Sequence, residues 1–209
     1  MIVIGITGSI GMGKSTAAEM LRDLGVPIHD SDASVHRLLG PDGGAVKAVG
    51  EKFPEALKKG SDGKTYIDRK ILGRAVFADR KKKKTLEDIL HPMVRSESDR
   101  FKEIMEEKGH DVIALDIPLL FETGGEDRVD LILCVSASAE VQKERVLARP
   151  GMTSEKFDKI VAGQMPDSEK RKRADHVIDS NVSFDKMRQQ LSSIVEGLRL
   201  SPKARKKKS

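Results

Sequence analysis

Residues 2–16 read Ile-Val-Ile-Gly-Ile-Thr-Gly-Ser-Ile-Gly-Met-Gly-Lys-Ser-Thr, an apolar run followed by Gly8-x-x-x-x-Gly13-Lys14-Ser15 and a helix-forming stretch. Polyphosphate is bound by converging backbone N–H groups, and glycine lets a loop curl closely enough to present them. A strand, a glycine-rich loop ending in Lys-Ser and a helix, in this order, form a P-loop. The chain is therefore predicted to bind a nucleoside triphosphate.

Each part of this loop has an expected role. Lys14 is predicted to reach the transferring phosphate and Ser15 to bind magnesium through its hydroxyl, while the helix that opens near Gly13 turns its positive end toward the anion. A glycine-rich turn between two core elements, the alternative interpretation, does not require Lys14 and Ser15 together. The predicted nucleotide-binding residues of the loop are Gly8, Gly11, Met12, Gly13, Lys14, Ser15 and Thr16.

The composition limits the class of protein. A chain of 209 residues is expected to form one α/β domain. Five of its basic residues lie in residues 201–209, so the net charge of +5 comes from this tail and the preceding chain is neutral. We expect the tail to be a disordered, solvated end. With no Trp and only Tyr66, the chain lacks aromatic residues to stack on bases, so no specific nucleic acid is expected.

Cysteine usage and the N-terminal residues predict the compartment. The single Cys134 lies in an apolar run, which excludes a disulfide framework and favours a small core residue over a nucleophile. No N-terminal segment resembles a secretory signal or a membrane span. We therefore expect a cytoplasmic protein without membrane insertion, as a monomer or weak homo-oligomer.

The rest of the chain alternates between short apolar runs and helical patterns. Runs at 26–28, 112–117, 129–135 and 177–178 predict buried strands of a parallel sheet covered by helices on both faces. The interval 41–108 is too long for one crossover helix and is predicted to form a helical substrate-binding lobe. Its charge run, 80–84, is interpreted as a solvated helix face, with guidance of an anionic substrate as the alternative.

Two further segments bear on the type of nucleotide-binding protein. The segment 149–172 is charged and helical with Pro and Gly hinges, which is typical of a lid that closes over nucleotide. Asn181, the only Asn, is followed by Val182, so the Asn-Lys-x-Asp element of GTPases is absent. A conventional GTPase is excluded, and ATPases and small-molecule kinases remain.

A pair of carboxylates follows the second predicted strand, where a kinase would present a group to its acceptor. A carboxylate such as Asp32, ionised at neutral pH, can accept the proton of the acceptor hydroxyl. The alternative is that one residue of Asp30-Ser31-Asp32 only caps the helix that begins near Ala33.

With these motifs taken together, the chain resembles the dephospho-CoA kinase family from Ile2 to Leu200. The matching segments are residues 6–16, Gly-Val-Pro-Ile-His-Asp-Ser-Asp at 25–32 with His36, Leu-His-Pro at 90–92, Ile-Pro-Leu-Leu-Phe-Glu at 117–122 and Ala-Asp-His-Val-Ile-Asp-Ser-Asn at 174–181. The resemblance implies transfer of the γ-phosphate of ATP, with Mg²⁺, to the ribose 3′-hydroxyl of dephospho-CoA. It also implies a P-loop three-layer α/β/α core over residues 1–200, with a five-stranded parallel sheet, a helical CoA lobe and a lid.

The resemblance also assigns roles by position. Asp32 would be the catalytic carboxylate, and Lys14 would clamp the phosphate. Asp116 would hold a magnesium-bound water beside Ser15, unless it only satisfies amides at the strand end. Arg145, which enters the lid, would meet charge on the transferring phosphoryl group, and Arg149 would contact ATP, although either can be an ordinary exposed helix residue.

The acceptor is expected to meet a second set of side chains. His36 is the best placed, one helical turn beyond Asp32 on the same face. His91 and Pro92 have an alternative interpretation as a junction between two helices. The predicted substrate-binding residues are Asp32, His36, Arg69, His91, Phe121 and Glu122.

Departures from the family pattern and two rival functions complete the prediction. Met12 replaces the usual Ser, Ser31 replaces Ala, and Pro150-Gly151 stands where charged residues are common, which puts the adenine contacts in question.

One rival is a P-loop kinase of nucleosides or nucleoside monophosphates. The other is a nucleotide-regulated binding module anchored to RNA or a membrane by the tail, which predicts loss of activity on deleting residues 203–209.

Overall fold

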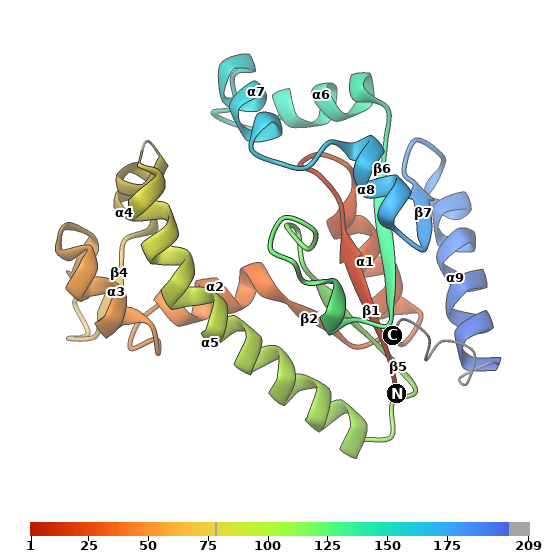
Figure 1. Ribbon diagram of the computed structural model, residues 1–209, viewed down its shortest axis with the longest axis horizontal. Helices are drawn as coiled ribbons and strands as arrows, with labels where there is room; N and C mark the ends of the chain where they lie inside the picture. The colour runs from red at the N-terminus through yellow and green to blue at the C-terminus, as the bar shows by residue number, and fades with distance from the viewer. Residues whose placement is uncertain (78, 201–209) are drawn as a thin grey trace. The chain divides into compact units, whose positions relative to one another are not determined.

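The computed structural model describes residues 1–77 and 79–200, so the predicted basic tail lies outside the described residues. The main sheet contains five parallel strands in the order β2-β5-β1-β6-β7 (Figure 1). Its strands are β1 (Ile2–Thr7), β2 (Ile28–Asp30), β5 (Val112–Asp116), β6 (Leu131–Ser136) and β7 (His176–Asp179). The predicted five-stranded parallel sheet of a P-loop kinase is confirmed.

Strand β1 is the middle of this sheet, which explains its continuous apolar sequence. It pairs in parallel with β5 on one side and with β6 on the other, and Ile6 lies opposite both Asp116 and Leu133. A strand paired on both sides and covered on both faces is buried along its length, and every residue of β1 after Ile2 is buried. The register places Asp116, the last residue of β5, beside the end of β1, one residue before the chain enters the glycine-rich loop.

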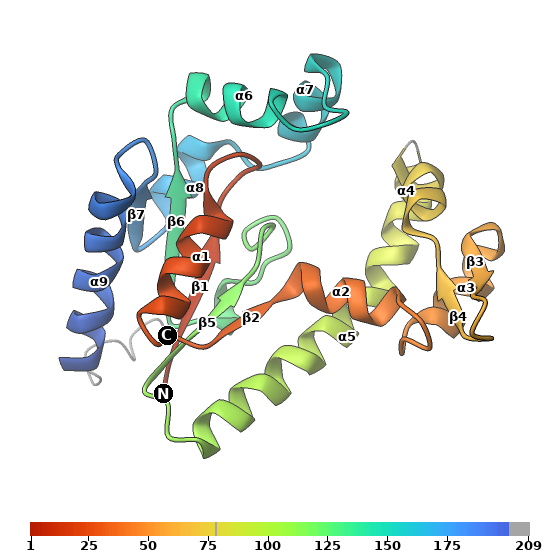
Figure 2. The same ribbon diagram turned by 180° about the vertical axis from the view of Figure 1, so that it is seen from behind.

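Helices α1 (Lys14–Asp23) and α9 (Phe184–Leu200) pack side by side on the sheet (Figures 1 and 2). Both are amphipathic, with apolar residues at helical spacing on the buried face. Leu21 and Leu191 are completely buried in a cluster that also contains Ile4 and Leu133 of the strands. This packing fixes the start of α1, and therefore the loop before it, against the sheet.

Three helices follow β6. They are α6 (Ala139–Leu147), α7 (Ser154–Ala162) and α8 (Asp167–Arg173), and a 3-10 turn, η2 (Glu126–Arg128), precedes β6. Ser138 caps α6 by accepting from Val141 N, and Thr153 caps α7 by accepting from Lys156 N. Helices α6 and α7 lie beyond the carboxyl ends of β1 and β6 (Figure 1).

The chain divides into two compact units, residues 30–103 and the remainder. The second unit, 30–103, has its own core of buried side chains, which includes Leu38, Val49, Phe53 and Ile67. Its elements are α2 (Ser31–Leu39), α3 (Val46–Lys52), η1 (Pro54–Ala56), β3 (Leu57–Lys59), β4 (Thr65–Ile67), α4 (Arg69–Phe77) and most of α5 (Arg80–Glu107).

The second unit differs from the predicted helical lobe in two respects. It contains an antiparallel hairpin, β3–β4, whose turn includes Asp62 and Gly63 with Gly63 at φ +82°. The alternative of a helix junction at His91-Pro92 is wrong, because α5 runs from Arg80 to Glu107 with Pro92 inside it. Proline removes one N–H from a helix, and α5 continues on both sides of that loss.

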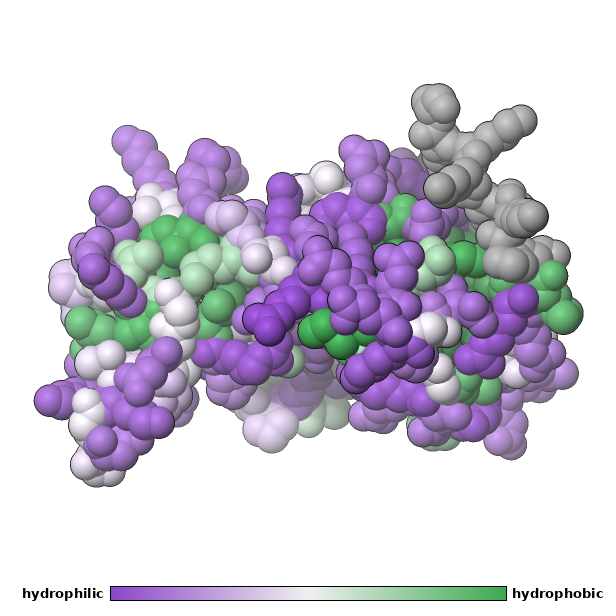
Figure 3. All heavy atoms as spheres, turned by 90° about the horizontal axis from the view of Figure 1, so that it is seen from below, coloured by the Kyte–Doolittle hydropathy of each residue, from purple (hydrophilic) through white to green (hydrophobic). Residues whose placement is uncertain are grey.

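Some apolar residues of the second unit remain at the surface. In Figure 3, green side chains gather over α3 and the β3–β4 hairpin, at the left of the view. Leu57 of the hairpin is 39% exposed and Phe77, at the end of α4, is 67% exposed. Exposed apolar residues are common on protein surfaces, since apolar atoms contribute more than half of the accessible area.

Two composition-based predictions concern the core and membranes. Cys134 is completely buried in β6 and has no disulfide partner, so the prediction of a small core residue is confirmed. Burial, followed by the charge of Asp167, raises the pKa of its thiol to about 12. Among residues 1–77 and 79–200, none of the helices combines the length and the apolar character that crossing a membrane requires.

Candidate active site

The glycine-rich loop has the backbone conformation that its sequence predicts. Gly11 and Gly13 have φ values of +78° and +88°, a region that side chains rarely adopt. Gly13 is the N-cap of α1, and no side chain caps this helix. The first N–H groups of a helix have no partner within it, so α1 offers donors to an anion.

The loop glycines also leave room for close packing beneath the loop. A β carbon on Gly8 would lie 2.7 Å from the carbonyl oxygen of Val135, and one on Gly11 would overlap Val146 Cγ2. These neighbours belong to β6 and α6. The loop therefore lies directly on both elements, and larger residues at Gly8 and Gly11 would displace it.

Lys14 and Asp116 form an ion pair at the base of the loop. Lys14 Nζ donates to Asp116 Oδ1 over 2.5 Å, and the two side chains are 15% and 6% exposed. Because Asp116 ends β5 beside the end of β1, the sheet register places the carboxylate against the first residue of α1. The structure thus brings together the predicted phosphate clamp and the predicted magnesium-site acid.

Met12 turns its side chain away from the space above the loop. It is 2% exposed, its sulfur accepts a hydrogen bond from Ala137 N, and its carbonyl accepts one from Ser180 Oγ over 2.7 Å. The Met12 side chain therefore fills the core under the loop. Its predicted contact with nucleotide would be made by the backbone.

Two glutamines that the sequence analysis did not identify hold the loop at Ile10. Gln142 Nε2 of α6 donates to Ile10 O over 2.8 Å, and Ile10 N donates to Gln164 Oε1 over 3.1 Å. Gln142 lies one helical turn before Arg145, so the sequence could have indicated it through the helix face that the two residues share. Gln164, between α7 and α8, carried no such signal.

Arg145 extends from α6 to the edge of the loop. Its Nη1 donates to Ser180 Oγ over 2.9 Å and its Nη2 to Ser180 O over 2.7 Å. A β carbon on Gly13 would lie 3.6 Å from Arg145 Nη1, which places the guanidinium beside the loop. Arg149 is exposed, and within the described chain its side chain has no hydrogen-bond or ion-pair partner.

Glu122 and Phe121, predicted to bind substrate, contact the end of the predicted lid segment. Glu122 accepts from the completely buried ammonium of Lys170 over 2.8 Å and from Met165 N over 2.8 Å. Burial raises the pKa of Glu122, but the hydrogen bonds from Lys170 and Met165 outweigh it, so the pKa lies below its ordinary value. Phe121 is buried under the guanidinium of Arg173, 4.7 Å from the ring centre.

We predict that replacing Glu122 with Gln destabilises the protein by about 3 kcal/mol, the order found when a buried ion pair loses one partner. The amide oxygen of Gln can still accept from Lys170, but the buried ammonium would lose its opposing charge, and its bond to Pro118 O is long, at 3.4 Å. Urea unfolding measures the loss. Glu126→Gln is the matched control, because its partner Arg173 is 44% exposed and a surface pair contributes less than about 1 kcal/mol.

Acidification provides a second readout of the same ion pair. Since the folded pKa of Glu122 is below its ordinary value of 4.5, the stabilisation is present above pH 4.5 and is lost as pH falls through the folded pKa. The difference between wild type and Glu122→Gln should therefore shrink below pH 4.5. Equal losses for Glu122→Gln and Glu126→Gln at neutral pH would contradict the assigned role of Lys170.

Ser15 and Thr16 lie in the first turn of α1, and the remaining predicted site residues belong to the second unit. Asp30 caps α2, because its Oδ1 accepts from Ala33 N over 2.9 Å. Asp32 and His36, one turn apart on α2, are both exposed, and within the described chain the Asp32 carboxylate has no hydrogen-bond or ion-pair partner. Capping is therefore the function of Asp30 and not of Asp32. Arg69 opens α4 and His91 lies within α5.

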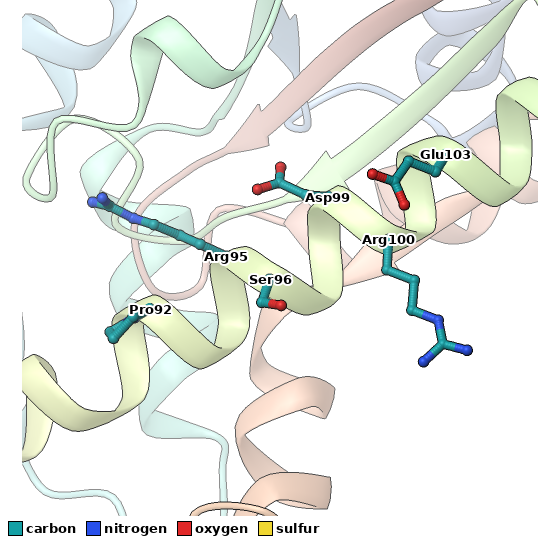
Figure 4. Close-up of a pocket in the computed structure, with 6 residues that line it drawn as sticks. All are labelled: Pro92, Arg95, Ser96, Asp99, Arg100 and Glu103. Carbon is teal, nitrogen blue, oxygen red and sulfur yellow. The ribbon is translucent and has the colours of Figure 1, made fainter.

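The second unit also contains a surface hollow of about 540 Å³ along α5. Pro92, Ser96, two arginines and two acidic residues line it, and Figure 4 shows the guanidinium groups of Arg95 and Arg100 pointing away from each other. Asp99 lies between the two arginines in sequence, and Glu103 follows Arg100. Because these cations do not converge, the hollow provides no anion site, and none of the predicted site residues lines it.

The donors available for a metal ion are few. Among residues 1–77 and 79–200, no group of three or more His, Cys, Asp or Glu side chains is arranged to hold a metal. Mg²⁺ in kinases is typically bound by one or two protein oxygens together with phosphates and water. The Ser15 hydroxyl at the start of α1 and the Asp116 carboxylate are oxygen donors of this kind, so the residues present suit Mg²⁺ bound with ATP.

Comparisons with known proteins agree on one family. A family model described as dephospho-CoA kinase matches residues 2–186. Dephospho-CoA kinases of Rhodopseudomonas palustris and Rhizobium meliloti are 47% and 49% identical to the chain, covering 98% and 95% of it and 100% and 99% of their own lengths.

Solved structures show the same similarity. A crystal structure of a Thermus thermophilus protein superposes with a TM-score of 0.77 at 38% identity, covering 94% of this chain and 97% of its own. Dephospho-CoA kinase from Campylobacter jejuni superposes with a TM-score of 0.71 at 26% identity, covering 96% and 98%.

Proposed function

The chain belongs to the dephospho-CoA kinase family, and from this membership we infer that it is the ATP-dependent kinase of the last step of coenzyme A biosynthesis. The reaction transfers the γ-phosphate of ATP to the ribose 3′-hydroxyl of dephospho-CoA and yields CoA and ADP. The structural observation that supports this function is the phosphate loop, with N–H groups at the start of α1 that no side chain caps and with Lys14 held at its base.

The transfer proceeds in line and without a phosphoenzyme. The acceptor oxygen forms a bond to the γ-phosphorus while the bond between that phosphorus and the bridging oxygen of ADP breaks. The proton of the hydroxyl passes to the Asp32 carboxylate, whose exposure and lack of a capping role support this assignment. The protein otherwise contributes positioning and charge neutralisation.

Cations in and beside the loop neutralise the transferring group. Lys14 interacts with the β- and γ-phosphates in exchange for Asp116, and Arg145 faces the charge that develops on the phosphoryl oxygens. Mg²⁺, when bound, neutralises charge on the same phosphates. Ser15 and Asp116 would hold it, Asp116 through a bound water, and the ion pair keeps both partners near the loop before nucleotide arrives.

Two segments complete the proposed substrate sites. Residues 149–172 act as the lid over ATP, with Arg149 at its edge, and Gly151, at φ +73° with open space around it, supports a hinge there. Residues 41–108 form the lobe for dephospho-CoA. His36, Arg69, His91, Phe121 and Glu122 are proposed to contact the acceptor, in a cytoplasmic protein that acts as a monomer or weak homo-oligomer.

The choice of phosphate acceptor distinguishes this function from the two rivals. We expect ADP release with magnesium-ATP and dephospho-CoA, and none above background with adenosine or AMP. Chromatographic detection of CoA confirms the product. Turnover with adenosine or AMP alone would make the chain a nucleoside or nucleotide kinase. No turnover with any acceptor, with ATP still bound, would favour a nucleotide-regulated binding module.

A further inference from the structure

Ser180 connects Arg145 to the phosphate loop. It follows β7 directly, is 5% exposed, and its N–H donates to Ser136 O over 2.9 Å. Its Oγ accepts from Arg145 Nη1 and donates to Met12 O. A β carbon on Gly13 would lie 3.1 Å from both Cβ and Oγ of Ser180, so Ser180 stands directly under the turn of the loop.

The hydrogen-bond inventory of these groups leaves one consistent arrangement. A serine hydroxyl has a single proton, which Ser180 gives to Met12 O, so it can only accept from Arg145. The second guanidinium nitrogen donates to Ser180 O. Both bonds use the same residue as acceptor, which fixes the plane of the guanidinium as well as its position. Three of the five N–H groups of Arg145 remain for another anion.

The start of α6 is held by the segment that follows β7. Asn181 Oδ1 accepts from Ser138 N, at the N-cap of α6, over 3.0 Å, and Asn181 N donates to Asp179 Oδ1 over 2.8 Å. Ser180 and Asn181 therefore hold α6 at its N-cap and at Arg145, nearly two turns later. Long arginine side chains lose considerable rotamer entropy when they are ordered, and here two hydrogen bonds to Ser180 hold the guanidinium before substrate binds.

We propose that Ser180 is a positioning residue for phosphoryl transfer, because its hydroxyl orients the Arg145 guanidinium toward the γ-phosphate in register with the loop. This inference rests on the proposed function of Arg145. Ser180 itself does not touch the phosphates. Its effect on the rate is transmitted through Arg145, and a variant without the hydroxyl leaves Arg145 with one bond, to Ser180 O, and freedom to rotate.

A double-mutant cycle tests this coupling. Ser180→Ala should lower kcat for dephospho-CoA by about 10- to 100-fold, the size associated with hydrogen bonds to charged groups. The Kd for ATP should change less than about threefold, because the loop keeps its backbone donors. In an Arg145→Ala background the same change should cost less than about twofold. Ser192→Ala is the matched control, since its hydroxyl donates to Glu196 within α9.

Other outcomes overturn the proposal. An equal loss of kcat with and without Arg145, or a loss confined to ATP affinity, would mean that Ser180 only supports the loop. An unchanged kcat in Ser180→Ala would remove it from the mechanism. The cycle is repeated with Ser180→Cys, which keeps the volume with a weaker hydrogen-bonding group, so a folding failure of the Ala variant does not decide the result. Absence of turnover by the wild type would instead contradict the proposed function.

Discussion

Replacing Arg145 with Ala should lower kcat for phosphoryl transfer about 10³-fold, or about 4 kcal/mol of transition-state stabilisation. The guanidinium lies beside the loop at Gly13 and is fixed by Ser180 before ATP binds. A charge held in place requires no reorganisation as negative charge develops on the phosphoryl oxygens. The KM for ATP should rise far less than kcat falls, since an arginine of this kind acts mainly in the transition state.

The controls separate charge from geometry. Arg145→Lys keeps a cation but cannot reproduce the paired bonds to Ser180 Oγ and O, so it should recover little of the loss. Lys143→Ala removes an exposed cation two residues away on α6 and should leave kcat unchanged. Pre-steady-state mixing of enzyme with both substrates measures the chemical step directly. If Arg145→Ala retained more than a tenth of the wild-type rate of that step, the transition-state role of Arg145 would be wrong.

The parts that the sequence predicts well are those whose chemistry is local. The loop 8–16 has residue types that few other conformations need, and its positive φ angles follow from its glycines. Buried parallel strands are continuous apolar runs, so the sequence indicates that they exist, while their ends differ from the predicted ones by up to two residues. The predicted start of a strand at Val129 moved to Leu131, because Asp130 uses its carboxylate to accept from Val3 N.

The parts that the sequence misses depend on contacts distant in sequence. Ser180 and Gln164 become site residues only because β7 and the segment before α8 reach the loop, more than 150 positions away in the chain. The pairing of Lys170 with Glu122 is equally nonlocal, and α8, rich in charged residues, reads as solvated although Lys170 is fully buried. The β3–β4 hairpin is a different case, since Asp62-Gly63 was an available turn signal inside a segment interpreted as helical.

Asp30 and Asp32 illustrate how the structure separates two roles that the sequence leaves open. A helix start needs one side-chain acceptor, and Asp30 supplies it to Ala33 N. Asp32 lies inside the first turn of α2 and stabilises the helix through its interaction with the helix dipole. At an exposed position this interaction contributes less than about 1 kcal/mol. Losing its charge should therefore leave the stability of the second unit nearly unchanged.

Asp32→Asn should accordingly lower kcat by about 10²- to 10⁴-fold, the range for a general base, with thermal stability near that of the wild type. The amide keeps the size of the carboxylate but cannot take the proton of the acceptor hydroxyl. Asp30→Ala should instead lower the free energy of unfolding by about 1 kcal/mol, because α2 loses its N-cap. Asp88→Asn, an exposed carboxylate on α5, is the activity control. A folded Asp32→Asn variant with wild-type kcat would exclude proton transfer to Asp32, and the positioning and neutralisation of the phosphates by Lys14, Arg145 and the loop would then have to account for the rate.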